Sequence, residues 1–256
     1  MNENKYTIQS VEKACDLLMV FNGRSEELGA SDLSRILGIS KSTVWKLLNT
    51  FENKGFLVKN QNSDKYSVSI QLFQIACQYY NQVSTRFTVR NFMERLSKKY
   101  GETIHFAVRD GDEIVYVEKI DGTFSINIYS RIGRRSPLYA PAVGKVILAN
   151  LGQEQIADIL NRLQLKAYTE KTITSKEALL KALDTIREQG YAVDNEEYEL
   201  GIRCAGVPIR NIAGRIVGGL SVSGTKSRMT NDLVLEIVKD LKAVSEDITR
   251  HIGYND

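Results

Sequence analysis

A short run of polar residues between positions 41 and 49 has the types and spacing that could contact DNA. Its members are Lys41, Ser42, Thr43, Trp45, Lys46 and Asn49. Serine, threonine and asparagine can form hydrogen bonds with base edges or phosphates, and lysine can do either. Near the start of a helix, such side chains are the ones that a recognition helix inserts into a major groove. The alternative interpretation is the solvated polar face of a three-helix bundle.

A second stretch could bind an anion. Pro141 suits the first turn of a helix, with Ala140 as the half-in residue before it. The backbone N–H groups that follow lack partners within such a helix and point outward at its positive end; they belong to Ala142, Val143 and Gly144. The alternative interpretation is an ordinary solvated helix start.

Two serines could add hydroxyl groups to such a site. Ser221 and Ser223 are two residues apart on a predicted strand, so both side chains face the same side of it. Buried hydroxyls need hydrogen-bond partners, and a polar ligand could supply them. Hydrogen bonds within the sheet are the alternative.

Cysteine and histidine are too sparse for most other chemistry. Cys15, Cys77 and Cys204 are odd in number and far apart, and the histidines are His105 and His251. This spacing predicts neither a disulfide framework nor a metal site. The sequence has no glycine-rich phosphate loop and no G-x-S-x-G elbow, so we expect no cofactor. Cys204 with the distant His105 is the one candidate enzymatic dyad, and no local motif supports it.

Composition and charge narrow the class of protein. The 256 residues are 43% hydrophobic and 25% charged, as in soluble globular proteins, and no apolar run approaches a membrane span. The N-terminus lacks the features of a secretory signal, so we expect a cytoplasmic protein. The net charge is only +3, but residues 1–34 carry −3 and residues 35–68 carry +4. This asymmetry is typical of a face that meets phosphates, although a lysine-rich solvated surface would give it too.

The spacing of apolar residues predicts the elements of the first 68 residues. An amphipathic helix is expected over residues 7–22, with a buried stripe of Ile8, Val11, Cys15, Leu18 and Phe21. Ser31 is the expected N-cap of a second helix that Gly38 ends, and Ser40 is the N-cap of a third. The third helix is expected to bury Val44, Leu47, Leu48 and Phe51. A hairpin of runs 56–59 and 65–68 follows, which completes a winged helix-turn-helix.

The rest of the chain predicts a connector and a mixed domain. Residues 69–84 contain no glycine or proline and are expected to form a stiff linker helix. Beyond them, strands are expected near 103–108, 113–120, 124–131, 191–194, 205–209 and 216–223. Helices are expected near 86–100, 141–150, 153–163, 175–189 and 230–251. We therefore predict an α+β protein with a DNA-binding domain over 1–68, a linker helix over 69–84 and a mainly antiparallel sheet domain over 85–256.

Several segments together resemble the IclR family of bacterial transcription regulators. In the first half they are Val11–Ala14, Gly38–Val44 and Gly55–Leu57. In the second half they are Arg131–Gly133, Pro137–Lys145, Gly190–Asp194 and Ser221–Gly224, which match that family's effector-binding domain in order and spacing. Each segment is weak evidence by itself, but together they are strong evidence, and the resemblance extends over nearly the whole chain.

The resemblance implies a GAF-like α/β effector-binding domain, a homodimer or dimer of dimers, and a small organic acid as effector. It places Asp194 and Cys204 in the effector pocket, with Leu138 and Ile202 as apolar walls. A carboxylate would repel an anionic ligand, so we expect Asp194 to accept a hydrogen bond from a ligand hydroxyl. With the residues at 142–144, 221 and 223, this set is the predicted effector site.

Three interpretations remain open from the sequence. The favoured one is a regulator that binds double-stranded DNA at an operator with two-fold symmetry and responds to a small anionic metabolite. It is not an enzyme in this interpretation and has no membrane partner. The second is an enzyme fused to a winged helix, which would show hydrolase or transferase activity. The third is a protein-interaction module, which salt-dependent DNA affinity would exclude.

Overall fold

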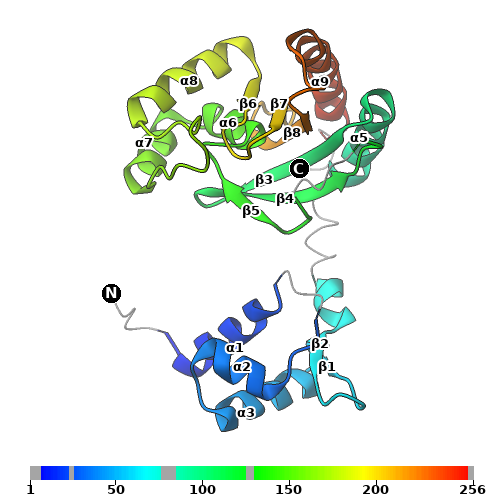
Figure 1. Cartoon of the computed structure of the whole chain (residues 1–256), viewed down its shortest axis with the longest axis vertical. Coiled ribbons are helices and arrows are strands. Elements are labelled where there is room, and N and C mark those ends of the chain that lie inside the picture. The colour runs from blue at the N-terminus through cyan, green and yellow to red at the C-terminus, as the bar shows by residue number, and fades with distance from the viewer. Residues whose placement is uncertain (1–6, 23–25, 76–84, 125–129, 253–256) are drawn as a thin grey trace. The chain divides into compact units, whose positions relative to one another are not determined.

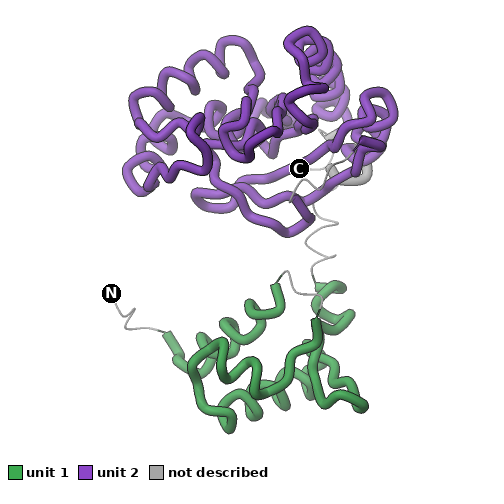
Figure 2. The backbone as a smooth tube through the Cα atoms, viewed as in Figure 1, with its two compact units in different colours: residues 1–82 green, residues 83–256 purple. Residues whose placement is uncertain are grey.

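The structure, a computed structural model, describes residues 7–22, 26–75, 85–124 and 130–252. The chain divides into two compact units, residues 1–82 and residues 83–256 (Figure 2). Each unit has its own hydrophobic core, and we describe each by itself.

The first unit is a winged helix-turn-helix (Figure 1). Its elements are α1 (Gln9–Val20), α2 (Ala30–Leu37), α3 (Lys41–Asn53), β1 (Leu57–Lys59) and β2 (Tyr66–Val68). The two strands form the predicted antiparallel hairpin, and Leu28 adds a bridge to Tyr66. Residues 70–75 are helical, and the remainder of the predicted linker helix, 76–84, lies outside the described residues.

The turn between α2 and α3 forms as the sequence predicts. Gly38 ends α2 with a φ of 65°, a left-handed conformation that glycine adopts without strain. Ser40 caps α3, because its hydroxyl accepts a hydrogen bond from the Thr43 N–H at 3.3 Å. The prediction that Ser31 caps α2 is wrong. Gly29 is the N-cap, and the Asp32 carboxylate accepts its N–H at 3.2 Å, so the helix begins before Ser31.

The predicted buried stripe of α1 is also partly wrong. Leu17 and Phe21 enter the core, whereas Ile8 and Val11 are 67% and 54% exposed. Cys15 is exposed as well. Apolar residues cover two sides of this helix, and one unit buries only the side that faces α2 and α3.

The second unit is built on a six-stranded sheet in the order β5-β4-β3-β8-β7-β6, with every neighbouring pair antiparallel. Its strands are β3 (Thr103–Asp110), β4 (Glu113–Ile120), β5 (Arg135–Pro137), β6 (Ala192–Asn195), β7 (Ile202–Arg210) and β8 (Ile216–Thr225). Its helices are α5 (Thr85–Tyr100), α6 (Ala142–Ala149), α7 (Gln153–Arg162), α8 (Lys176–Gln189) and α9 (Asn231–Ile252). The predicted α+β class and the mainly antiparallel sheet are confirmed. The strand expected at 124–131 falls largely on residues 125–129, outside the described residues.

Helices cover both faces of this sheet (Figure 1). On one face, α5 and α9 pack on a core that includes Phe106, Leu220 and Val222. On the other face, α6, α7 and α8 pack on a core that includes Ala107, Tyr116 and Cys204. Successive side chains along each strand therefore point to opposite faces of the sheet. This alternation determines which polar side chains lie on the face that α6 covers.

Candidate functional site

The exposed side of α3 is the first candidate site. Val44, Leu48 and Phe51 anchor the helix in the core of the first unit, as predicted. The opposite side therefore faces solvent, and Trp45 is 59% exposed there. This arrangement holds a polar surface on a rigid, capped helix.

The structure brings the six residues predicted to bind DNA to the start and outer side of α3. Lys41, Ser42, Trp45 and Lys46 are exposed, and Thr43 and Asn49 are half-buried. The Ser40 hydroxyl lies 3.0 Å from that of Ser42 and 2.8 Å from that of Thr43, so these hydroxyls are oriented by the cap. Neither lysine forms an ion pair with a described residue, which leaves both ammonium groups available to phosphates.

The second candidate site is a cavity in the second unit, between the start of α6 and the sheet. The space between its lining atoms is about 460 Å³ with the adjoining open solvent included, and the centres of water-sized molecules can occupy about 40 Å³ of it. All six strands contribute to its walls, together with the start of α6, the loop before β5 and the loop that joins β6 to β7. The lining residues are His105, Tyr116, Ser130, Arg134, Ser136, Pro141, Ala142, Val143, Asp194, Tyr198, Glu199, Ile202, Cys204, Ser221 and Ser223.

Most of the predicted effector residues meet in this cavity. Those that line it are Ala142, Val143, Asp194, Ile202, Cys204, Ser221 and Ser223. Leu138 and Gly144 do not line it: Leu138 is fully buried in the core. A Cβ atom on Gly144 would lie 2.8 Å from the Leu138 carbonyl oxygen, so this glycine permits close packing of α6.

The start of α6 offers hydrogen-bond donors to the cavity. The helix begins one residue later than predicted, because Pro141 is its N-cap with a ψ of 145° and Ala142 is its first residue. The Pro141 carbonyl accepts the N–H of Lys145 at 3.0 Å. The N–H groups of the first three helical residues, two of which line the cavity, have no partner among the described residues. They form the positive end of a helix that is buried along its whole length.

Two buried serines face the cavity from β8, but their surroundings differ. The Ser223 hydroxyl lies 3.3 Å from Nδ1 of His105, whose Nε2 lies 2.6 Å from the Ser130 hydroxyl. Ser221 is only 2% exposed, and its hydroxyl has no hydrogen-bond partner among the described residues. A hydroxyl that lines a cavity and has no protein partner is well placed to bind a ligand.

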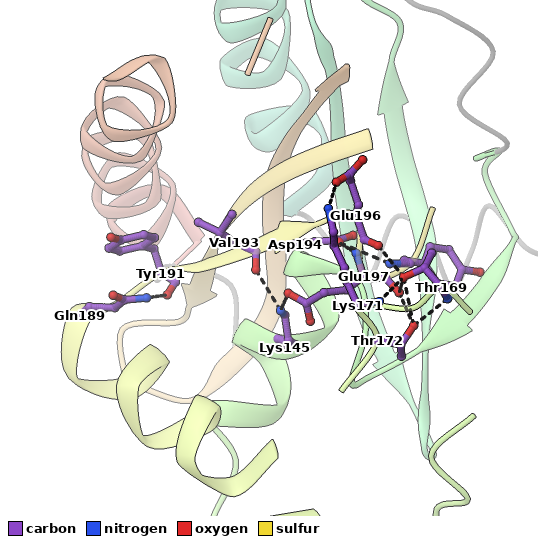
Figure 3. Close-up of polar contacts among 11 residues, drawn as sticks. Lys145, Thr169, Lys171, Thr172, Gln189, Tyr191, Val193, Asp194, Glu196 and Glu197 are labelled. Atoms are coloured by element: carbon purple, nitrogen blue, oxygen red, sulfur yellow. Dashed lines mark hydrogen bonds and ion pairs between the residues drawn. The ribbon is translucent and has the colours of Figure 1, made fainter. Parts of the chain in front are cut away.

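Asp194 brings a carboxylate to the same sheet, since in the strand register it lies opposite Cys204, which in turn lies opposite Ser223. Its Oδ1 accepts the backbone N–H groups of Glu197 at 2.7 Å and Tyr198 at 3.4 Å. The residue is 3% exposed, and burial raises the pKa of its carboxyl to about 7, although the nearby Lys145 opposes the shift. Figure 3 shows Lys145 reaching β6, where its ammonium group donates to the Val193 carbonyl at 2.9 Å, and the loop after β6, where it pairs with Glu197.

His105 and Cys204, the one candidate enzymatic dyad of the sequence, line the same cavity. Their protonation states near neutral pH do not suit nucleophilic catalysis. Burial raises the pKa of the Cys204 thiol well above its ordinary value and lowers the pKa of His105 to about 3. The thiol is therefore protonated near neutral pH, and the imidazole is a weak base.

Sequence reasoning missed several lining residues. The sequence analysis assigns no place in the effector site to His105, Arg134, Ser136, Tyr198 or Glu199. Strand alternation could have found His105, since it lies opposite Ser221 in the β3–β8 register. The others lie in or next to loops, where no periodic pattern predicts the direction of a side chain.

Comparison with known proteins agrees with this arrangement. Residues 10–61 match the IclR helix-turn-helix domain, and residues 77–250 match the C-terminal domain of the bacterial transcriptional regulator IclR. The chain belongs to the IclR family of bacterial transcription regulators.

Individual IclR-family proteins match nearly the full length of the chain. It is 39% identical to the HTH-type transcriptional regulator KdgR of Escherichia coli over 250 residues, 98% of this chain and 95% of KdgR. It is 38% identical to XynR of the same organism over 247 residues, 96% of this chain and 98% of XynR. The crystal structure of Thermotoga maritima IclR superposes with a TM-score of 0.82 at 33% identity, covering 97% of this chain and all of that chain.

The family therefore assigns DNA binding to the first unit and transcription regulation to the protein. In the described part of the chain, no helix is long and apolar enough to cross a membrane.

Proposed function

We propose that this IclR-family regulator binds its operator through α3 and changes its operator affinity when a small organic acid occupies the cavity under α6. The observation that carries the proposal is the Ser221 hydroxyl, which forms no hydrogen bond with a described residue and faces the same cavity as the first turn of α6, on a residue that is only 2% exposed. A carboxylate bound there would accept hydrogen bonds from Ser221 and from the N–H groups of Ala142 and Val143.

We propose that the effector-binding residues are those of the predicted set that line the cavity. Ile202 and Val143 supply apolar surface, while Ser221 and Ser223 supply hydroxyls. Arg134 also lines the cavity, and its guanidinium forms no ion pair with a described residue. Its positive charge would help to attract an anion into this unit, against the opposing charge of Glu199 in the same cavity.

We further propose a homodimer, or a dimer of dimers, that reads an operator with two-fold symmetry. A single short recognition helix contacts few base pairs, so useful specificity requires two half-sites. The apolar side of α1 that one unit leaves uncovered is a candidate contact between two copies. It carries Ile8, Val11, Cys15 and Met19.

A ligand screen with a matched variant tests the proposed effector site. Thermal-shift measurements on small carboxylates would identify acids that stabilise the second unit, and calorimetry would give their dissociation constants. Because a hydrogen bond to a charged partner contributes about 1.5–3 kcal/mol, Ser221→Ala should weaken binding roughly 10- to 100-fold. The double variant with Ser223→Ala should weaken it further and still bind DNA. Equal affinity of wild type and double variant would show that the site is misplaced.

A further inference from the structure

The two oxygen atoms of the Asp194 carboxylate have different surroundings. Oδ1 accepts the two backbone N–H groups of the loop after β6. Oδ2 forms no hydrogen bond with a described residue, although the whole residue is 3% exposed and lines the cavity. Oδ2 is therefore the oxygen that a ligand would meet.

The nearby cation does not neutralise Asp194. The Lys145 side chain is 4% exposed, and its ammonium group is paired with Glu197, whose side chain is 12% exposed (Figure 3). The same ammonium donates to the Val193 carbonyl rather than to Asp194. Glu197 Oε2 is itself buried without a partner among the described residues. One buried ammonium thus lies beside two buried carboxylates, and ionised Asp194 leaves this cluster with an excess negative charge.

The other groups around the cavity do not remove that excess. Arg134 and Glu199 both line the cavity, from the loops before β5 and before β7, and their charges oppose each other. His105 on β3 is neutral, since burial lowers its pKa to about 3. Burial raises the pKa of the Cys204 thiol on β7 and of the Tyr116 hydroxyl on β4, so both stay protonated.

We propose that an acid ligand enters this cavity together with one proton, which Asp194 holds on Oδ2 and donates in a hydrogen bond to a carboxylate oxygen of the ligand. The inference rests on the proposed function, because it concerns the same cavity. In this proposal, protonated Asp194 donates and therefore selects a ligand with a hydrogen-bond acceptor. The expectation from the sequence was the reverse, with Asp194 accepting a hydrogen bond from a ligand hydroxyl.

The chemistry balances with the protonated buffer as the proton source, which leaves the buffer base in solution. One proton leaves the buffer acid and binds the Asp194 carboxylate, while the ligand carboxylate keeps its negative charge. Two carboxylates at hydrogen-bond distance cannot both be ionised in a buried site without strong repulsion, and a shared proton converts that repulsion into a charge-assisted hydrogen bond. In the ligand-free cavity, burial already raises the pKa of Asp194 to about 7, so the proton is available near neutral pH.

Calorimetry on the full-length protein tests the inference, with lactate, succinate, gluconate and benzoate as probes. The probe that binds most tightly at pH 6 is then titrated between pH 6 and pH 8.5. We expect a constant dissociation constant below about pH 7 and about a tenfold increase for each pH unit above it. Titration in phosphate and in Tris, which differ in ionisation enthalpy, should show uptake of about one proton per ligand at pH 8 and almost none at pH 6.

Three variants separate Asp194 from its neighbours. Asp194→Asn can still donate to the ligand and cannot titrate, so its affinity should not depend on pH. Glu199→Gln removes the other carboxyl of the cavity whose pKa is raised by burial, and it should keep the wild-type pH dependence of binding. Ser221→Ala should weaken binding equally at every pH.

The outcomes distinguish this inference from the proposed function. Binding without proton uptake, or loss of the pH dependence in Glu199→Gln rather than in Asp194→Asn, would overturn the role of Asp194 and leave the proposed function intact. Failure of every probe to bind at pH 6 would overturn both. The buffer comparison uses wild-type protein alone, so it decides the matter even if a variant does not fold.

Discussion

Within one strand, successive residues of β8 serve different purposes. Leu220 and Val222 fill the core under α5 and α9, whereas Ser221 and Ser223 face the cavity on the other side of the sheet. Ser223 already interacts with His105, but the Ser221 hydroxyl has no partner among the described residues. A ligand would therefore gain more from Ser221 than from Ser223.

On α3, we expect Lys46→Ala to weaken DNA binding without unfolding the first unit. The Lys46 side chain is exposed and lies away from the Val44, Leu48 and Phe51 anchor. If its ammonium group contacts a phosphate, affinity should fall similarly for all sequences, and the log–log salt slope should become shallower by about one. Gel-shift titrations at several salt concentrations measure both effects. Lys181→Ala, an exposed change in the second unit, is the control; equal affinity of wild type and Lys46→Ala would exclude this contact.

For single residues, the sequence predicts the direction of a side chain better in helices and strands than in loops. Ser221, Ser223 and Cys204 could be placed because alternation along a strand fixes their side. Arg134 and Tyr198 could not, since their directions depend on loops and on partners far away in the sequence. Leu138 packs in the core and does not line the cavity, because a family motif includes residues that pack the core as well as residues that line the cavity.

Among the elements, α6 depends on glycines beneath and within it. A Cβ atom on Gly206 of β7 would lie 3.2 Å from the Ala142 carbonyl carbon, and one on Gly219 of β8 would lie 2.7 Å from Val143 Cγ2. The helix start can approach the sheet only because these side chains are absent. That approach brings the N–H groups of the first turn to the cavity.

We therefore expect Gly144→Ala to disturb both stability and ligand binding. The added methyl group would meet the carbonyl oxygens of Leu138 at 2.8 Å and Pro137 at 2.9 Å, so the helix start must shift. Overpacking of this kind destabilises proteins by about 1–3 kcal/mol. Urea unfolding and calorimetry with a carboxylate ligand provide the measurements. Gly152→Ala is the control, because its nearest neighbour, Gln155 Oε1, lies at a comfortable 3.7 Å. Wild-type stability and affinity in Gly144→Ala would contradict this role of α6.

The order of the elements was predictable from spacing and caps, whereas some contacts between them were not. In α1, Leu17 rather than Val11 is buried, because apolar residues occupy two sides of the helix and the sequence does not show which side faces α2. The strand β5 was missed because it is only three residues long and includes Pro137.

For the whole molecule, the apolar side of α1 that the first unit leaves uncovered is the proposed contact between two copies of the chain. Val11→Asp should leave the first unit folded, because Val11 is 54% exposed, but should weaken the proposed dimer by placing a charge in its apolar contact. Light scattering would measure the mass, and gel shifts should show weaker operator binding. Ser10→Asp, one position away on the helix, is the control. A wild-type protein that is monomeric both free and on its operator would contradict the dimer.

The last prediction joins the two units through thermodynamics and needs no assumption about how they sit relative to each other. If an acid in the cavity changes operator affinity by some factor, the operator must change the affinity for that acid by the same factor. The factor for couplings of this kind is about 5- to 150-fold, which calorimetry can resolve. Lys46→Ala should lower operator affinity and leave acid binding by the free protein unchanged, while Ser221→Ala should do the reverse. Because linkage concerns the difference between two states, each variant should give equal factors in both directions. An acid that binds the cavity with the same affinity in the presence and absence of operator would show that the cavity does not regulate DNA binding.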